Sequence, residues 1–266
     1  MFEDMDPYVI LLIFVAVILA VSLLAAFLPR MMKLDMRQVH LMVALSAGIF
    51  LGILFFMLLP ETFEEAHESG AGAMDPVLWI VGGFLVVLFV DVIVKRMHMN
   101  RCACDECVDK DHLHEVTSLT AFIGLAIHAV VDGLVIALAI NHGGELTAFV
   151  LIGISLHKFA DVFALSSIFT LTNIDKKKTL VFMIIFILIT PLAAILSMPL
   201  VDVLEDFAMF IPLAVATGIF MYVGIYSLLP EAFHERRDSL KSLMIVVAGI
   251  VAIALIAILL GDAHAH

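Results

Sequence analysis

Between Thr117 and Ile140 the sequence is TSLTAFIGLAIHAVVDGLVIALAI, an apolar stretch that contains one histidine, one aspartate and no lysine or arginine. Its length matches the roughly 20 apolar residues that a helix needs to cross the hydrocarbon core of a bilayer. An ionised aspartate at the centre of such a helix costs roughly 2.5–3.5 kcal/mol on insertion scales. We therefore expect a membrane-spanning helix in which Asp132 has a partner.

Other segments of the chain have the same length and composition, so the sequence predicts eight membrane-spanning helices. The eight spans cover about Tyr8–Leu28, Val39–Leu59, Val77–Val94, Thr117–Ile140, Leu146–Leu171, Thr179–Val201, Ala208–Leu229 and Ser242–Leu260. Apolar residues make up 63% of the chain and charged residues 15%, against about half and a quarter in a soluble domain. A soluble bundle would need polar helix faces, which the first, sixth and eighth spans lack. The predicted fold is an all-α integral membrane protein, with residues 1–266 forming one transmembrane domain.

Basic residues occur on one side of the predicted membrane. Of the 14 Lys and Arg residues, Lys158 lies inside the fifth span, and all the others follow the first, third, fifth and seventh spans. Because cytoplasmic loops carry the excess of Lys and Arg, this alternation predicts that both termini lie outside the cytoplasm. We expect residence in the plasma membrane, with acidic outer segments that attract cations.

One internal repeat relates the two halves of the chain. Residues 48–50 and 58–61 are Gly-Ile-Phe and Leu-Leu-Pro-Glu, and the same motifs recur 170 positions later at 218–220 and 228–231. The second and seventh spans cross the membrane in opposite directions, so the copies have inverted topology. Inverted repeats are typical of secondary transporters, whose substrate site lies near the midplane between the repeats. We predict that spans 1–3 are related to spans 6–8 around central spans 4 and 5.

Each of the two central spans carries a histidine and an aspartate four residues apart. His128 and Asp132 lie in the fourth span, and His157 and Asp161 lie in the fifth. This spacing puts both side chains of a pair on one helix face, about half-way through the membrane. Two imidazoles and two carboxylates supply four ligands for one tetrahedral ion. These donors suit Zn²⁺, and also Fe²⁺, Mn²⁺ and Cd²⁺, but not Cu⁺, which prefers sulfur.

Lys158 follows the second histidine directly. A fixed ammonium there either compensates the charge of the aspartates or excludes a second dication. Three other interpretations of these residues stay open: hydrogen-bonded core polar groups, a metal-independent proton channel, or a structural ion pair. An intramembrane zinc hydrolase would need a carboxylate as general base beside a histidine, as in His-Glu-x-x-His, and Lys158 occupies that position. We therefore expect no enzymatic activity.

Two peripheral groups of polar residues flank the central pairs. The predicted cytoplasmic segment of about 95–116 contains six potential metal ligands, His98, Cys102, Cys104, Cys107, His112 and His114. Thiols in a reducing compartment favour metal binding over disulfides. On the outer side, candidates for the entrance of a cation path are Glu61, Glu64, His67 and Glu68. The chain has no P-loop or dinucleotide motif and a net charge of −12, so we expect neither a nucleotide nor a nucleic acid as partner.

In its eight spans, in His-x-x-x-Asp-Gly at 128–133 and in His-Lys-x-x-Asp at 157–161, the sequence resembles the ZIP (Zrt/Irt-like) metal transporters. The resemblance extends over nearly the whole chain. It implies uptake of zinc or a similar ion toward the cytoplasm, a mobile helix bundle that moves against a static one, a homodimer, and both His-x-x-x-Asp pairs as metal ligands. Family members with two adjacent metals have further ligands at the positions of Ala129 and Lys158 and a carboxylate near Ser227. These departures favour a single metal.

Overall fold

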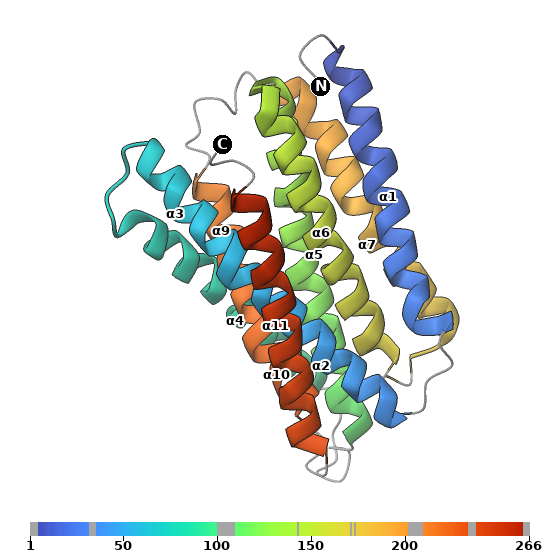
Figure 1. Cartoon of the computed structure of the whole chain (residues 1–266). Coiled ribbons are helices and arrows are strands. Elements are labelled where there is room, and N and C mark those ends of the chain that lie inside the picture. The colour runs from blue at the N-terminus through green and yellow to red at the C-terminus, as the bar shows by residue number, and fades with distance from the viewer. Residues whose placement is uncertain are drawn as a thin grey trace.

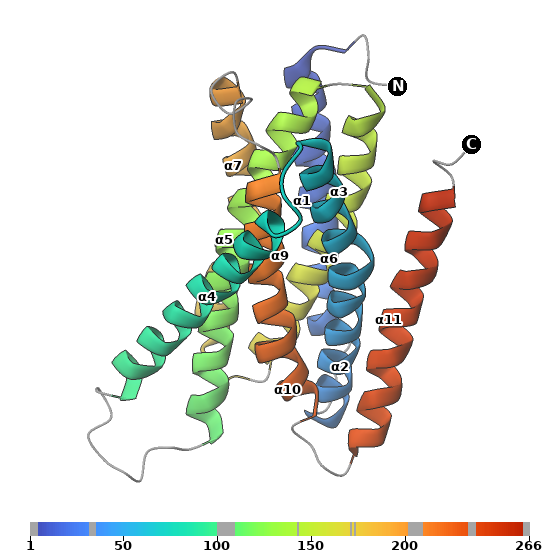
Figure 2. The same ribbon diagram turned by 90° about the vertical axis from the view of Figure 1, so that its left-hand side faces the viewer.

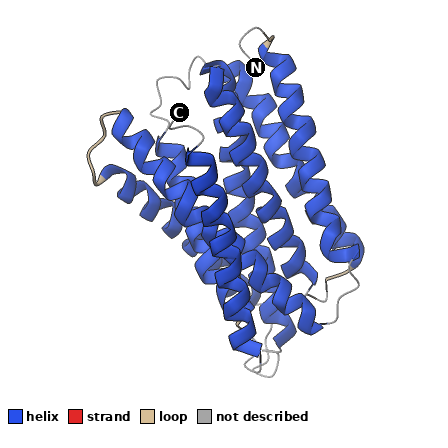
Figure 3. Cartoon of the chain, viewed as in Figure 1, coloured by secondary structure: helices blue, strands red, loops and turns tan. Residues whose placement is uncertain are grey.

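The computed structural model describes residues 5–31, 36–99, 110–142, 144–170, 172, 174–201, 210–233 and 238–262, and within these ranges the chain is helical with no strand (Figure 1, Figure 3). The elements in chain order are α1 (Pro7–Met31), α2 (Met36–Ile53), η1 (Leu54–Leu58), α3 (Leu59–Glu68), α4 (Asp75–Met99), α5 (Lys110–His142), α6 (Gly144–Thr170), α7 (Lys176–Ser197), η2 (Met198–Leu200), α9 (Phe210–Tyr222), η3 (Val223–Leu228), α10 (Leu229–Ala232) and α11 (Ser239–Asp262).

Eight described segments are long and apolar enough to cross a membrane, which confirms the predicted all-α membrane fold. They are Pro7–Pro29, Arg37–Glu68, Asp75–Met97, Leu119–Asn141, Val150–Thr170, Lys176–Leu200, Phe210–Ala232 and Ser239–Leu259. The second span is longer than predicted, because the helix continues through Pro60 to Glu68 instead of ending at Leu59. Helices α4 and α5 likewise extend into the segment predicted as a loop, to Met99 and from Lys110.

The described spans pack as two groups, in each of which inner helices lie along outer ones. In the first group α5 packs along α7 and α6 along α1, and in the second group α2 packs along α11 and α9 along α4. Figure 2 shows α4 and α11 on opposite flanks of the second group, with α2 and α9 between them. The outer helices expose apolar side chains, among them Leu12, Phe89, Leu196 and Leu259. Such surfaces suit contact with lipid, whereas the inner helices are mostly buried.

The predicted inverted repeat relates α1 to α7, α2 to α9, α4 to α11 and α5 to α6. Under this relation the pair α5–α7 becomes α6–α1, and the pair α2–α11 becomes α9–α4, so the observed helix pairing has the symmetry that the repeat requires. Gly48 in α2 lies against the backbone of Val246 in α11, and its counterpart Gly218 in α9 lies against the backbone of Ile80 in α4. A Cβ atom at either glycine would overlap a carbonyl oxygen of the neighbouring helix, so this close packing requires glycine. Both observations agree with the repeat, which stays a prediction.

The first leucine of each Leu-Leu-Pro-Glu motif ends a π-helical turn, Leu54–Leu58 in the first copy and Val223–Leu228 in the second. The amide of Leu59 donates to the carbonyl of Leu54, five residues earlier, and the amide of Leu229 donates in the same way to Gly224. The proline that follows each of these leucines has no amide proton, so a regular α-helical ladder cannot continue there. π-Helical turns often lie at functional sites.

The two ends of the molecule differ in charge. We call the end that carries Glu64, Glu68 and Asp75 the acidic face, and the opposite end, which carries Lys95 and Lys176, the basic face. Helix α1 begins and helix α11 ends on the side of the acidic face (Figure 1). Both ends of the described chain therefore lie on the same side of the bundle.

Candidate metal site

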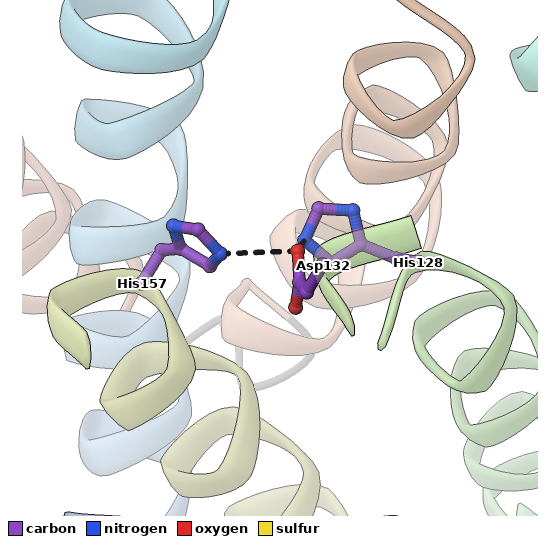
Figure 4. A group of neighbouring side chains, drawn as sticks. All are labelled: His128, Asp132 and His157. Carbon is purple, nitrogen blue, oxygen red and sulfur yellow. Dashed lines mark hydrogen bonds and ion pairs between the residues drawn. The ribbon is translucent and has the colours of Figure 1, made fainter. Parts of the chain in front are cut away.

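Helices α5 and α6 bring three of the four predicted ligands together (Figure 4). His128 and Asp132 project from successive turns of α5, and His157 projects from α6 toward them. The Nε2 atoms of His128 and His157 lie 3.3 and 3.2 Å from Asp132 Oδ1. All three side chains are buried. The four-residue spacing of the α5 pair thus places its two side chains on one face of the helix.

The distances in this group suit a tetrahedral zinc ion. Nitrogen and oxygen ligands lie about 2.0–2.1 Å from zinc, which puts neighbouring ligand atoms about 3.3 Å apart. Both histidine–aspartate distances match that separation, and the three ligand atoms all lie within 4.8 Å of one another. Asp161 lies farther away, with its Oδ2 4.0 Å from His128 Nε2. Asp161 therefore lies beside the three-residue group, and its role as the fourth ligand stays a prediction.

Lys158 lies between the two aspartates and is completely buried. Its ammonium donates a hydrogen bond to Asp132 Oδ2 at 3.1 Å and lies 3.8 Å from Asp161 Oδ2. A buried ammonium needs such counter-charges because leaving water costs it several kcal/mol. Within the described part of the chain, neither carboxylate oxygen of Asp161 has a hydrogen-bond partner. That is unusual for a buried carboxylate.

A cavity of about 640 Å³ connects this group with the acidic face. Its inner end is lined by His128, Asp132 and His157. Toward the acidic face its wall carries four carboxylates of α3, Glu61, Glu64, Glu65 and Glu68. Glu61 precedes the other three by three, four and seven residues, so one helix face presents all four to the cavity. On another side of the group, the ring of Phe220 in α9 lies 4.9 Å from the ring of His128.

The predicted entrance residues divide between the cavity wall and the outer surface. His67 is exposed and does not line the cavity, whereas the three predicted glutamates do. The sequence prediction omits Glu65, because it ends the span at Leu59 and treats the acidic segment as a loop. The spacing of Glu61, Glu65 and Glu68 along a helix is the signal that identifies the missing residue.

The predicted cytoplasmic group falls outside what the structure describes. Its three cysteines belong to residues 100–109, which are not among the described residues. His98 lies in α4, and His112 and His114 lie in α5, at positions where the side chains are likewise not described. Metal binding by this group stays a prediction.

The arrangement of helices and ligands can be compared with known proteins. A family model described as ZIP Zinc transporter matches residues 7–116 and 98–257. The chain belongs to the ZIP zinc transporter family. This membership confirms the resemblance found in the sequence motifs, and the matched residues include both helices that carry the candidate site.

Two relatives match this ZIP family member over almost its full length. It is 24% identical over 288 aligned positions to "Zinc transporter ZIP9-B" of Xenopus laevis, covering 91% of this chain and 93% of that protein. It is 23% identical over 292 positions to "Zinc transporter ZupT" of Campylobacter jejuni subsp. jejuni serotype O:2, covering 98% of this chain and 99% of that protein.

Proposed function

We propose that this protein carries a divalent transition metal, with zinc as its main substrate, across the membrane through a mononuclear site. The ligands are His128, Asp132 and His157, with Asp161 beside them. The proposal rests on one observation: both histidine Nε2 atoms converge on one oxygen of Asp132 at zinc-ligand spacing, at the inner end of a cavity. A site without thiolates binds zinc less tightly than a structural Cys site, so the ion can leave again. The same donors accept Fe²⁺, Mn²⁺ and Cd²⁺.

The direction of transport in this proposal is from the acidic face to the basic face. We place the acidic face outside the cytoplasm because Lys and Arg gather at the opposite end. The carboxylates of α3 raise the local concentration of cations along the cavity and so feed the ligands at its inner end. Alternating access, in which one group of spans moves against the other, then delivers the ion to the cytoplasm. A homodimer in the plasma membrane belongs to the same proposal.

Lys158 limits the site to one ion. Its ammonium lies 3.1 Å from Asp132 Oδ2, next to His157, where a second dication would have to bind. Repulsion between the ammonium and a dication at such short range is strong away from bulk water. The ammonium also compensates part of the negative charge of the two aspartates, so the site does not need a second metal.

Zinc uptake into proteoliposomes tests the site. The double variant with Asp132→Ala and His157→Ala lacks two ligands and should show no saturable uptake of radioactive zinc. The matched control is His67→Ala, which removes an exposed histidine that does not line the cavity. It should transport zinc as the wild type does. Uptake unchanged in the double variant would overturn the assignment of the site.

A proton channel is the second candidate, because His157, Asp132 and Lys158 form a continuous hydrogen-bonded chain. It would conduct protons when all metal is chelated, whereas the proposed transporter should not. Catalysis by a bound zinc is disfavoured, because the residue beside His157 is an ammonium and not the carboxylate base that hydrolysis requires.

A further inference from the structure

The two oxygens of Asp132 have different partners. Both histidine Nε2 atoms approach Oδ1, at 3.3 Å from His128 and 3.2 Å from His157. The ammonium of Lys158 donates instead to Oδ2, at 3.1 Å. In the proposed site the ion binds between the histidines and Oδ1. One carboxylate therefore holds the ion on one oxygen and a fixed positive charge on the other.

Lys158 reaches Asp132 from the closed side of the site. Asp132 and both histidines line the cavity, whereas Lys158 does not line it and has no exposed surface. The same ammonium lies 3.8 Å from Asp161 Oδ2 and 5.0 Å from the ring centroid of Phe186 in α7. A charge enclosed in this way acts on a neighbouring ion more strongly than a charge at the surface, because less solvent screens it.

The ammonium weakens Asp132 as a metal ligand for two reasons. Its hydrogen bond to Oδ2 draws negative charge away from Oδ1. The ammonium also repels a dication held at Oδ1, across the width of one carboxylate. Groups that bind a metal ligand from behind commonly change metal affinity about 10- to 100-fold. Weaker binding suits a transport site, because the ion has to leave in every cycle.

We propose that Lys158 sets the rate at which zinc leaves the site, by weakening its bond to Asp132. The inference rests on the proposed transport function and goes beyond the exclusion of a second ion. The ammonium stays on Oδ2 while the ion occupies Oδ1, so the site releases zinc although its ligands are buried. Lys158 does not contact the ion and acts through Asp132, as a positioning residue.

The zinc affinity of a variant that loses the charge but keeps a hydrogen-bond donor tests this role. The amide of Lys158→Gln can still donate to Asp132. In every protein compared, the predicted ligands of the segment of about 95–116 are replaced by serine, and zinc-buffered equilibrium dialysis gives the Kd. We expect Lys158→Gln to lower the Kd about 10- to 100-fold. Lys158→Arg keeps the charge and should bind nearly as the wild type does, and so should Lys178→Gln, at an exposed position of α7.

Zinc flux into proteoliposomes separates this role from a purely structural one. Tighter binding should lower both the KM and the maximal rate of Lys158→Gln, because release becomes slower. A lysine that only stabilises the fold predicts the opposite for binding, since its loss would leave zinc affinity unchanged or weaken it. If Lys158→Gln unfolds without metal, zinc should raise its Tm by more than it raises that of the wild type. An equal or smaller rise in Tm would overturn the inference.

Failure of the inference and failure of the proposed function give different results. A Kd of Lys158→Gln equal to or above the wild-type value would overturn the inference and leave zinc transport standing. A wild-type protein that binds zinc but moves none across the membrane would overturn the proposed function, and the role of Lys158 in release with it.

Discussion

Phe50 and Phe220 stack face to face, with ring centroids 3.5 Å apart and an angle of 4° between the ring planes. They hold the same position in the two Gly-Ile-Phe motifs, and the contact joins α2 to α9. Both rings are fully buried, and Phe220 also contacts the ring of His128. Equivalent residues of a twofold arrangement can touch each other only near its axis. If the predicted repeat is present, its axis passes near this stack, close to the candidate metal site.

Loss of this stack should destabilise the protein. Phe50→Ala should reduce the free energy of unfolding by about 3–5 kcal/mol, since it leaves a cavity between α2 and α9. The measurement is thermal unfolding in one fixed detergent. Phe89→Ala is the control, because Phe89 is 67% exposed on the outer helix α4. A Tm that falls equally in both variants would contradict the central position of the stack.

Adjacent glycines in α4 provide a matched pair of substitutions. A Cβ atom at Gly83 would overlap the backbone carbonyl oxygen of Val215 in α9, whereas a Cβ atom at Gly82 meets nothing within 4 Å. We expect Gly83→Ala to lower the Tm by forcing α4 away from α9. Gly82→Ala should keep or raise the Tm, because alanine favours a helix over glycine by about 1 kcal/mol. A Gly83→Ala variant as stable as Gly82→Ala would argue against the close packing of α4 on α9.

Stability at low pH should depend on a contact between Arg37, at the start of α2, and Asp238, next to α11. Hydrogen bonds from the Arg37 guanidinium keep the pKa of Asp238 below its ordinary value of 3.8. A carboxylate with a lowered pKa stabilises the fold above its unfolded pKa, and that stability is lost as the pH falls through the folded pKa. Asp238→Asn should therefore lower the Tm at pH 7. The difference in Tm between this variant and the wild type should shrink as the pH falls below 3.8. A difference in Tm that stays constant with pH would exclude a charge effect.

The number of ions in the membrane site should depend on Lys158. Lys158→Asp replaces a buried ammonium with a carboxylate beside His157, so a second dication gains a ligand and loses a repelling charge. In a protein whose predicted ligands in the segment of about 95–116 are replaced by serine, we expect the zinc bound at saturation in equilibrium dialysis to rise from one to two ions per chain. Lys178→Asp, which changes the same charge at an exposed position of α7, should bind as the wild type does. Equal stoichiometry in the two variants would remove the proposed role of Lys158.

The spans and the α5 pair could be predicted from the sequence, because length, hydropathy and the spacing of His128 and Asp132 are local properties. The continuation of the second span to Glu68 could not be predicted from the sequence, because Pro60 ordinarily interrupts a helix. Only the π-helical turn before Pro60 lets the helix continue. The larger distance of Asp161 from His128 could not be predicted either. The rotation of α6 against α5 is set by packing throughout the bundle and is not a local property of the sequence.

Zinc content of the purified protein tests the central claim most directly. Cys102, Cys104 and Cys107 are replaced by serine, and so are His98, His112 and His114, to remove the predicted ligands of the segment of about 95–116. The protein is then loaded with zinc in detergent, freed of excess metal, and analysed for zinc per chain. We predict one zinc ion in this protein and in its His67→Ala variant, and none after Asp132→Ala. One zinc ion retained after Asp132→Ala would contradict the site between α5 and α6.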